Sequence, residues 1–254
     1  MSSMRSLLAV LAIVSGAYEP GTVPPESSPQ PSSSGRVLHV GRGGIQAAVD
    51  RARPGDTIRV RRGTYRGRVE IRGASKRGVS LLGDRATIQG AVSVRDTAAV
   101  TLRGLTVTRG VGVDDVDRYV LDGLRLVGSG VAVRHSSGGT ISRVLVRTAP
   151  VGIALADSPA QLRATRTFVR DVTVQGNGTG IALDGVRAVT VSRARVLGNA
   201  TGVAATAVRE AVLSDSDVSG SQIGVSLSAG TDLLLSGNRL QSNVTDVVHP
   251  PEVP

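Results

Sequence analysis

Short runs of alternating apolar and polar residues return at a nearly constant step through the second half of the chain. A glycine followed by a β-branched residue marks each return, and only the step from Gly152 to Gly180 is clearly longer than the others. Strands that repeat about every 22 residues are typical of a parallel β-helix, in which each turn of the coil stacks on the next. The six markers are Gly110-Val111, Gly130-Val131, Gly152-Ile153, Gly180-Ile181, Gly202-Val203 and Gly224-Val225.

Alignment on these markers predicts which side chains stack inside the coil. Each unit has room for three short strands, and a period of two residues points every second side chain inward. Counting units from Thr57 predicts an all-β solenoid of about eight or nine turns. Two-residue corners separate the strands, and arginine at Arg143 and Arg193 suits such a bend less well than glycine or aspartate. The predicted inward column contains Leu102, Leu121, Ile141, Val169, Val191, Leu213 and Leu235.

The first residues have a different composition. The apolar run Leu7–Val14 follows a basic residue and precedes small residues, which predicts a secretory signal peptide over residues 1–17. An uncleaved membrane anchor is the alternative. Residues 18–36 are rich in proline and serine, which predicts a disordered linker. Residues 37–254 then form one β-helix domain. The prediction is therefore a secreted or cell-envelope protein whose mature form has no stable membrane span.

A short amphipathic helix is predicted at the start of the domain, over about residues 44–53. Pro54-Gly55-Asp56 ends it, and a strand follows from Thr57. A helix in this place covers the open end of a solenoid, whose bare strand edges would invite aggregation. The apolar positions Ile45, Ala48, Val49 and Ala52 define its buried face.

The stretch IQAAVDRARPGDTIRVRRGTYRG, followed by the repeated units, resembles the opening of right-handed parallel β-helix proteins of the pectate-lyase-like superfamily, with NosD-like or CASH-type repeats. The resemblance extends from residue 37 to about residue 248. It implies a right-handed coil. It does not imply one activity, because the superfamily contains lyases, hydrolases, epimerases and copper-site maturation proteins of the NosD type.

Charge and composition narrow the partners. The net charge of +10 favours anionic partners such as acidic polysaccharide or cell-wall polymer, although arginine scattered by a GC-rich genome would give the same total. One Phe, three Tyr and no Trp leave no stacking platform for nucleic acid. The absence of cysteine excludes disulfides and a thiolate metal site. No cofactor is expected.

Two adjacent columns collect charged residues on one edge of the predicted coil. Residues one unit apart lie one above another, about 5 Å apart. Several carboxylates, one histidine and two arginines therefore gather there. The candidate catalytic residues are Asp96, Asp114, Asp115, His135 and Asp157, and the candidate substrate-binding residues are Arg95, Arg134 and Asp184.

Three interpretations of this edge stay open. In a polysaccharide hydrolase, paired carboxylates would act as general acid and base. In a lyase, Asp96, Asp115 and Asp157 would hold Ca²⁺, with Arg134 as the base. In the third, the acids are ordinary turn residues, because corners favour aspartate in any protein. The break in the repeat beside Asp157, within the long unit that ends at Gly180, is the only long insertion and keeps the enzyme hypothesis open.

Three Asn-x-Thr triplets begin at Asn177, Asn199 and Asn243. They could be glycosylation sites. Asn199 lies one repeat unit after Asn177, and Asn243 lies two units after Asn199. This spacing instead favours an asparagine ladder along one turn of the coil.

The sequence thus favours a non-catalytic or uncharacterised module that contacts an anionic polysaccharide or another cell-surface polymer. A hydrolase or lyase that acts on a uronate-containing glycan is the first alternative, and a structural spacer is the second. The oligomeric state does not follow from the sequence.

Overall fold

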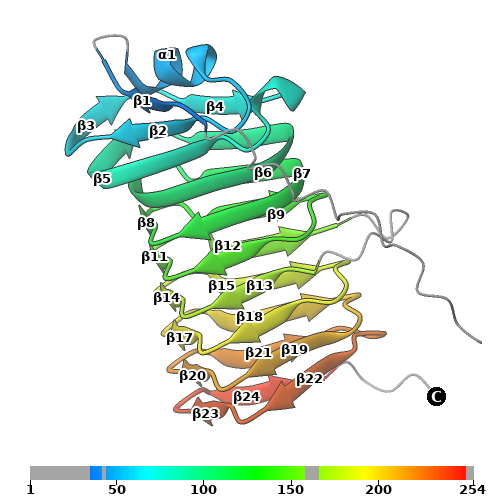
Figure 1. Ribbon diagram of the computed structural model, residues 1–254. Helices are drawn as coiled ribbons and strands as arrows, with labels where there is room; N and C mark the ends of the chain where they lie inside the picture. The colour runs from blue at the N-terminus through cyan, green and yellow to red at the C-terminus, as the bar shows by residue number, and fades with distance from the viewer. Residues whose placement is uncertain (1–34, 42–43, 158–165, 250–254) are drawn as a thin grey trace, which may run out of the picture. The chain divides into compact units, whose positions relative to one another are not determined.

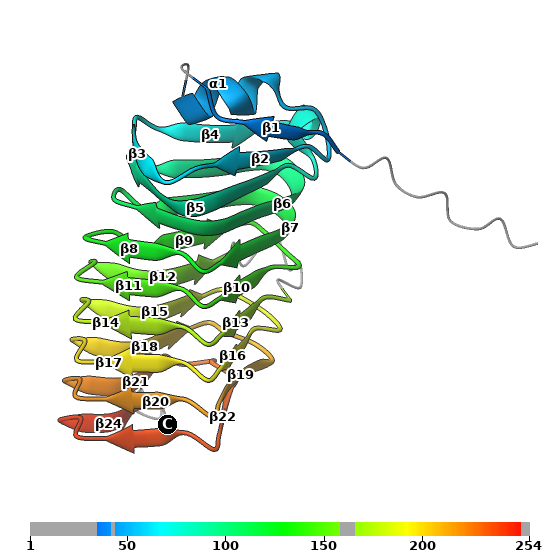
Figure 2. The ribbon, with the colours of Figure 1, turned by 60° about the vertical axis from the view of Figure 1, so that its left-hand side comes forward.

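The structure is a computed structural model that describes residues 35–41, 44–157 and 166–249. The predicted signal peptide and nearly all of the predicted linker lie outside these residues. The described chain forms a right-handed parallel β-helix of about nine turns with one α-helix, α1 (Gly44–Arg51), at its N-terminal end. Figures 1 and 2 show the turns stacked along one axis, each made of short parallel strands. The predicted fold is confirmed.

The coil has three faces. The first contains the predicted inward column, and every neighbouring pair from Leu102 to Leu235 is in parallel register as predicted. Its short strands are β1 (Val37–His39), β2 (Thr57–Val60), β10 (Thr140–Ser142), β13 (Phe168–Arg170), β16 (Thr190–Ser192), β19 (Ala211–Ser214) and β22 (Leu233–Ser236).

The second and third faces follow in the same way along each turn. The second contains β3 (Gly63–Arg66), β8 (Arg125–Val127), β11 (Leu145–Arg147), β14 (Thr173–Gln175), β17 (Arg195–Leu197), β20 (Asp217–Ser219) and β23 (Arg239–Gln241). The third contains β4 (Val69–Arg72), β9 (Val131–Arg134), β12 (Val151–Ala156), β15 (Thr179–Asp184), β18 (Thr201–Thr206), β21 (Ile223–Leu227) and β24 (Thr245–Val248).

Three long strands bend from one face to another in the early turns. β5 (Ser80–Gln89) pairs with β2 and then β3, and β6 (Val92–Val107) passes across all three faces. β7 (Val111–Asp122) covers the third and first faces. A short 3₁₀ helix, η1 (Ala74–Lys76), joins β4 to β5. The early turns are therefore less regular than the later ones.

The helix α1 closes the N-terminal end as predicted. Ile45, Ala48 and Val49 are buried against the first turn. The buried carboxylate of Asp56 ties this end together, because it accepts hydrogen bonds from the backbone N–H groups of Arg36 and Arg53 at 2.9 Å each. The Arg36 guanidinium donates to Asp56 at 2.7 Å. That hydrogen bond outweighs burial and lowers the pKa of Asp56 to about 2. Arg36, the last residue of the predicted linker, is thus already part of the packed cap.

The marker glycines are needed for close approach of the backbone. A Cβ at Gly202 would lie 2.5 Å from the carbonyl oxygen of Gly224 and 2.6 Å from Val218 Cγ1. Gly180 has the same relation to Gly202, also at 2.5 Å. Because no side chain fits there, a glycine recurs at this position on every turn from Gly130 to Gly224.

The predicted asparagine ladder is present. Asn199 Oδ1 accepts hydrogen bonds from the N–H of Asn177 at 2.9 Å and from Asn177 Nδ2 at 3.1 Å. Ser221 takes the next place in the column, and its N–H donates to Asn243 Oδ1 at 2.9 Å. Asn177 and Asn199 are only 4% and 3% exposed, which favours the ladder over glycosylation at these two positions.

From Gly104 to Gly237, the corners after the first face adopt positive φ at their second residue. Arg143 and Arg193 do so at 52° and 48°, although arginine suits this conformation poorly. Their guanidinium groups explain it. Arg143 bonds to the buried Asp122, and Arg193 Nε donates to Asp171 at 2.7 Å. Arg143, Asp171, Arg193 and Asp215 occupy this corner position on four successive turns, so the sign of the charge alternates along the coil.

The C-terminal end has no cover among the described residues. Val247 stacks on Val225 as predicted. Val225 is the last fully buried apolar residue of the described chain, whereas Leu235, Leu240 and Val247 are only partly buried. The coil is therefore closed at one end and open at the other in the part of the chain that the structure describes.

Candidate functional site

The two charged columns predicted from the sequence lie side by side where the third face ends. Strand pairing aligns Arg95 with Asp114 and Asp114 with Arg134. The same column continues through Ala156 to Asp184. The next residue along each of these turns gives Asp96, Asp115, His135 and Asp157. We call these two columns together the charged ridge.

The outer column of the ridge is a corner at which the chain leaves the third face. Asp96, Asp115 and His135 have φ values of 52°, 53° and 47°. Aspartate tolerates this left-handed conformation better than most residues. The corner thus explains the aspartates as bend residues and at the same time points their side chains outward on successive turns.

Some side chains of the ridge have a hydrogen-bond or ion-pair partner and others have none. His135 Nδ1 lies 3.1 Å from Asp114 Oδ1 on the preceding turn. Asp96 Oδ2 accepts from Arg72 Nε at 2.9 Å, a partner that the sequence analysis did not identify. Asp115 is exposed and has neither a hydrogen bond nor an ion pair within the described residues. The carboxylate oxygens of Asp115, like those of the exposed Asp184 farther along the ridge, are therefore available to a ligand.

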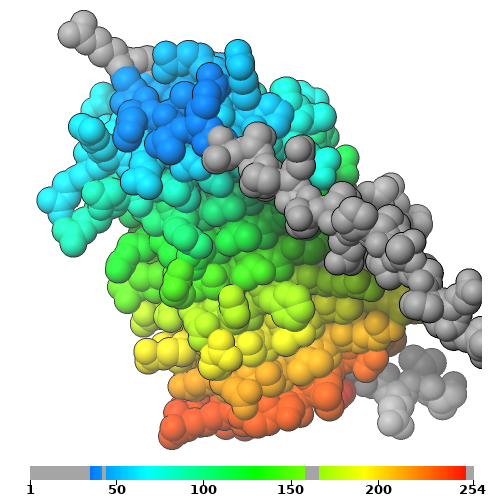
Figure 3. Space-filling model, viewed as in Figure 1, coloured from blue at the N-terminus to red at the C-terminus, as the bar shows by residue number. Residues whose placement is uncertain are grey.

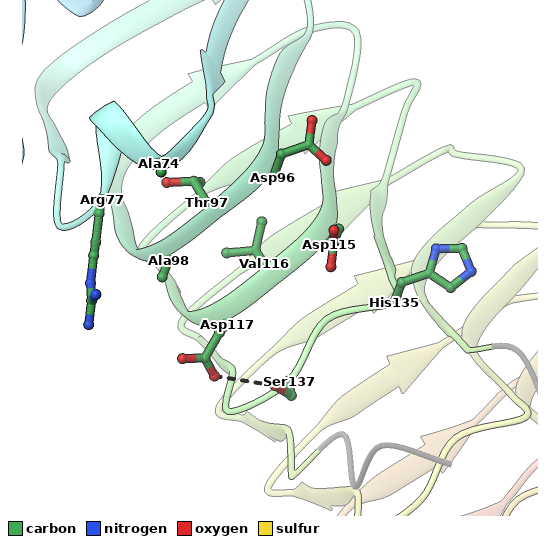
Figure 4. Close-up of a pocket in the computed structure, with 10 residues that line it drawn as sticks. All are labelled: Ala74, Arg77, Asp96, Thr97, Ala98, Asp115, Val116, Asp117, His135 and Ser137. Carbon is green, nitrogen blue, oxygen red and sulfur yellow. Dashed lines mark hydrogen bonds between the residues drawn. The ribbon is translucent and has the colours of Figure 1, made fainter. Parts of the chain in front are cut away.

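A hollow of about 370 Å³ lies on the outer side of the ridge. Figure 4 shows Asp96, Asp115 and His135 stepping along its wall from one turn to the next. Asp117 stands opposite, with Ser137 Oγ donating to its Oδ1 at 3.3 Å. We call this the acidic hollow, and its further lining residues are Ala74, Arg77, Thr97, Ala98 and Val116.

One polar group beside the acidic hollow has no partner among the described residues. Thr97 is 8% exposed, and its hydroxyl oxygen is buried without a hydrogen bond. A buried hydroxyl without a partner costs free energy. This site is therefore not optimised for stability in the way that the asparagine ladder is.

A second hollow of about 360 Å³ lies on the inner side of the ridge, on the third face. Arg68, Arg95 and Arg109 line it, and no carboxylate of the described chain does. None of the three forms an ion pair within the described residues. Arg95 Nε donates to Ser93 Oγ at 2.9 Å. We call this the cationic hollow.

The floor of the cationic hollow is made of small outward residues on successive turns. Ser93, Gly112, Ala132 and Ala154 are in direct register along the coil. Gly112 has no atom within 4 Å of an added Cβ and no positive φ. Gly112 therefore differs from the marker glycines, because a side chain would fit at its position without a clash. The floor is flat because its outward side chains are small, and the packing of the turns does not require this.

The ridge residues thus divide between two surfaces. Asp96, Asp115 and His135 face the acidic hollow, and Arg95 faces the cationic hollow. Arg134 and Asp184 continue the inner column but line neither hollow. Asp157 donates its N–H to the carbonyl oxygen of Asp184 at 3.0 Å. Most of the insertion that follows Asp157 lies outside the described residues.

Several lining residues were missed from the sequence. Arg68 and Arg109 lie next to Gly67 and Gly110, at the corners where the chain enters the third face. Extending the alignment by one turn toward the N-terminus would have brought Arg68 into register with Ala91, one position before Val92. The marker glycine is missing from that first turn, so nothing in the repeat flagged it.

The calcium site of the lyase hypothesis has no counterpart in the geometry of the described residues. No three histidine or acidic side chains among them converge closely enough to hold a metal ion. Asp96 is moreover engaged with Arg72. We derive no step that depends on a metal at the ridge.

Three solved structures with the same fold are, by their names, enzymes that act on polysaccharides. An alginate lyase from Paenibacillus sp. str. FPU-7 shares 15% identity, with a TM-score of 0.61 over 85% of this chain and 98% of the other. Pectate lyase Pel9A shares 13% identity, with a TM-score of 0.60 over 85% and 75%. An endo-xylogalacturonan hydrolase from Aspergillus tubingensis shares 12%, with a TM-score of 0.52 over 86% and 96%. At these identities the likeness shows the fold alone. No curated protein sequence matches the chain.

The repeated turns carry the family signal. The model of the family described as "Periplasmic copper-binding protein (NosD)" matches residues 83–250, which is more than half of the chain. The match begins within β5 and runs past β24. It includes the asparagine ladder and all residues that line the two hollows except those before residue 83. By this match the chain belongs to the NosD family of parallel β-helix proteins.

Proposed function

We propose that this protein is an exported β-helix that binds an acidic polysaccharide along its third face, in the cationic hollow. One observation carries the proposal: Arg68, Arg95 and Arg109 surround a hollow that no carboxylate of the described chain lines. Guanidinium groups without an internal ion pair are suited to carboxylates, which they can bind through two parallel hydrogen bonds. The flat floor of small residues gives an extended polymer room to lie across successive turns.

Two further observations support the ligand class and the location. The fold neighbours named above are lyases or hydrolases of alginate, pectate and xylogalacturonan. The family is described as periplasmic, and the N-terminal sequence predicts a signal peptide. Among the described residues, no helix is long and apolar enough to cross a membrane.

Copper, which the family description names, does not fit the described residues. Copper in proteins favours cysteine, methionine and histidine ligands. The chain has no cysteine, and its two methionines, Met1 and Met4, lie outside the described residues. His39, on β1, and His249, after β24, belong to opposite ends of the coil, and His135 lies between them. The proposed function therefore involves no copper-dependent step.

Binding of polygalacturonate and alginate to the full chain tests the proposal. The combined variant Arg68→Gln/Arg95→Gln/Arg109→Gln should weaken binding by about tenfold for each arginine, and salt should weaken the wild type. The control variant Arg125→Gln/Arg147→Gln/Arg195→Gln removes the same charge from the second face. Equal losses in both variants would reduce the effect to net charge, and no binding at any salt concentration would contradict the proposal outright.

A hydrolase or lyase is the second candidate, and the unpaired Asp115 favours it. Asp115 lies beside His135 on the wall of the acidic hollow, and Arg95 of the cationic hollow directly precedes Asp96 on that wall. A glycan that extends past Arg95 over the ridge would therefore meet the side chains of Asp115 and His135. Screening uronate polymers for new reducing or unsaturated ends, with and without Ca²⁺, tests this. Activity that Asp115→Asn abolishes would establish an enzyme; equal signals from both proteins would exclude this site.

A further inference from the structure

The net charge of the protein is concentrated in the cap and the first turn. Residues 35–78 contain twelve basic and three acidic side chains, a net charge of +9. Residues 79–249 contain seventeen basic and fourteen acidic side chains, a net charge of +3 over a stretch almost four times as long. A uniform genomic enrichment in arginine would not produce this gradient, so the charge of the first turn calls for a local explanation.

Four arginines follow one another along this turn from the first to the second face. Arg59 lies on β2, Arg61 and Arg62 form the corner, and Arg66 ends β3. All four are exposed, and their side chains form neither ion pairs nor hydrogen bonds within the described residues. We call them the cationic collar.

The carboxylates near the cationic collar do not neutralise it. Asp56 is bound to Arg36 and to the backbone of Arg53. Asp84 lines a hollow of about 480 Å³ together with Arg59 and Arg61, but forms no ion pair with either. The collar therefore presents unpaired guanidinium groups to its surroundings.

The cationic collar projects from the coil. In Figure 3 the side chains of the first turn, in cyan, stand out from the left side of the molecule. Arg62 and Arg66 line none of the hollows described above. Tyr65 stiffens this projection, because its hydroxyl donates to the carbonyl oxygen of Arg61 at 3.1 Å. Arg62 and Arg66 thus stand outside the hollow that Arg59 and Arg61 line. Projecting, stiffly held arginines fit a broad charged surface better than a single polymer chain, which a groove would hold.

We propose that the cationic collar docks on the surface of a bilayer that contains anionic phospholipids. Arginine binds phosphate through two hydrogen bonds, and basic clusters next to a membrane gain affinity from its negative surface potential. The partly buried ring of Tyr65, with its polar hydroxyl, is a side chain typical of the membrane–water interface. The first described residue, Gly35, lies next to Gly55 at the start of this turn, and the apolar run Leu7–Val14 precedes it in the chain. Membrane contact at the collar is compatible with cleavage of that run as part of a signal peptide, and equally with its retention as a membrane anchor.

Cosedimentation of the full chain with lipid vesicles tests this inference. The wild type should bind vesicles of phosphatidylglycerol and phosphatidylcholine at low salt, and should not bind pure phosphatidylcholine. Each arginine removed should cost about fivefold, so Arg61→Gln/Arg62→Gln/Arg66→Gln should bind roughly a hundredfold more weakly. A melting temperature equal to that of the wild type would show that the variant is folded.

The control is Arg125→Gln/Arg147→Gln/Arg195→Gln, which has the same net charge and lies on the same face as β3 but on later turns. Its affinity for the vesicles should stay within about threefold of the wild type, because these arginines lie outside the collar. An equal loss in both variants would reduce the effect to net charge and overturn the inference. So would the absence of wild-type binding to the anionic vesicles. A collar variant that loses glycan binding and keeps vesicle binding would assign the collar to the polysaccharide surface instead.

Discussion

The part of the coil before the insertion, residues 35–157, is irregular, and the part after it, residues 166–249, is regular. In the early part no two steps between neighbouring inward residues of the first face are equal, whereas from Val169 through Val191 and Leu213 to Leu235 every step is the same. We call the two parts the variable half and the regular half. The inward residues of the variable half on this face are Ile58, Leu81, Leu102, Leu121 and Ile141.

The two halves differ in what their surfaces offer. Hollows of about 480, 370 and 360 Å³ are lined entirely by the variable half. The hollow lined by Gly185, Arg209 and Gly230 in the regular half has about 220 Å³. The regular half instead contains the asparagine ladder, together with the greater part of the tight glycine column that begins at Gly130. Repetition thus accompanies the tight packing and the hydrogen-bonded ladder, and departures from it create the hollows to which we assign the proposed binding. The following substitutions, from the largest expected effect to the smallest, test this contrast.

A marker glycine in the regular half should matter for stability, whereas the outward Gly112 in the variable half should not. Gly202→Ala places a Cβ 2.5 Å from a backbone carbonyl oxygen, and should lower the free energy of unfolding by about 3 kcal/mol. Gly112→Ala, with no atom within 4 Å, should change it by less than about 0.5 kcal/mol. Chemical denaturation of both variants measures the difference. Equal losses would show that the two glycines have the same role.

The asparagine ladder should contribute measurably to the regular half. Asn199→Ala leaves the buried N–H of Asn177 without its acceptor, and should cost about 2 kcal/mol. Asn199→Ser is the control, because Ser221 fills the same column one turn later and accepts from the N–H of Asn199. The serine variant should lose less than the alanine variant in the same denaturation experiment. The contrary order would show that the ladder's hydrogen bonds are not what stabilises these turns.

The cap of the variable half should be sensitive to acid. The pKa of Asp56 in the folded protein is about 2, below the usual value of about 3.9 for an unfolded chain. Its stabilising effect is therefore complete above about pH 4 and is lost as the pH falls toward 2. Asp56→Asn should cost roughly 1.5 kcal/mol at pH 7. Melting curves from pH 7 to pH 2 should converge for wild type and variant; a constant gap would contradict the assignment.

The smallest effect is expected beside the acidic hollow. Thr97→Val removes a buried hydroxyl that has no partner among the described residues and keeps the shape of the side chain. It should stabilise the protein by up to about 1 kcal/mol, because no hydrogen bond is lost. A loss of stability, measured by thermal denaturation, would mean that this hydroxyl has a partner in solution. The gain would contrast directly with the loss at Asn199.

The sequence predicted most of what the core determines. The inward column from Leu102 to Leu235 and the charged ridge came from the same alignment, because register fixes all three faces at once. The outward arginines were not found in this way. Arg68 and Arg109 contribute nothing to the core, so no periodicity marks them, and which hollow they line depends on how β6 and β7 bend. At the corners the sequence identified the position but not the reason for the residue. Arginine suits a positive φ poorly, and the structure shows that Arg143 is held there by its bonds to Asp122 on the preceding turn.

That corner has a consequence for how the chain assembles. Units of equal length with interchangeable valine and leucine cores could stack out of sequence as they fold. A coil that skipped one turn would set Arg143 against Arg193, or Asp171 against Asp215, and like charges on neighbouring strands repel. The alternation of sign from Arg143 to Asp215 therefore favours pairing of each turn with the next one in sequence and disfavours pairing with the turn after that.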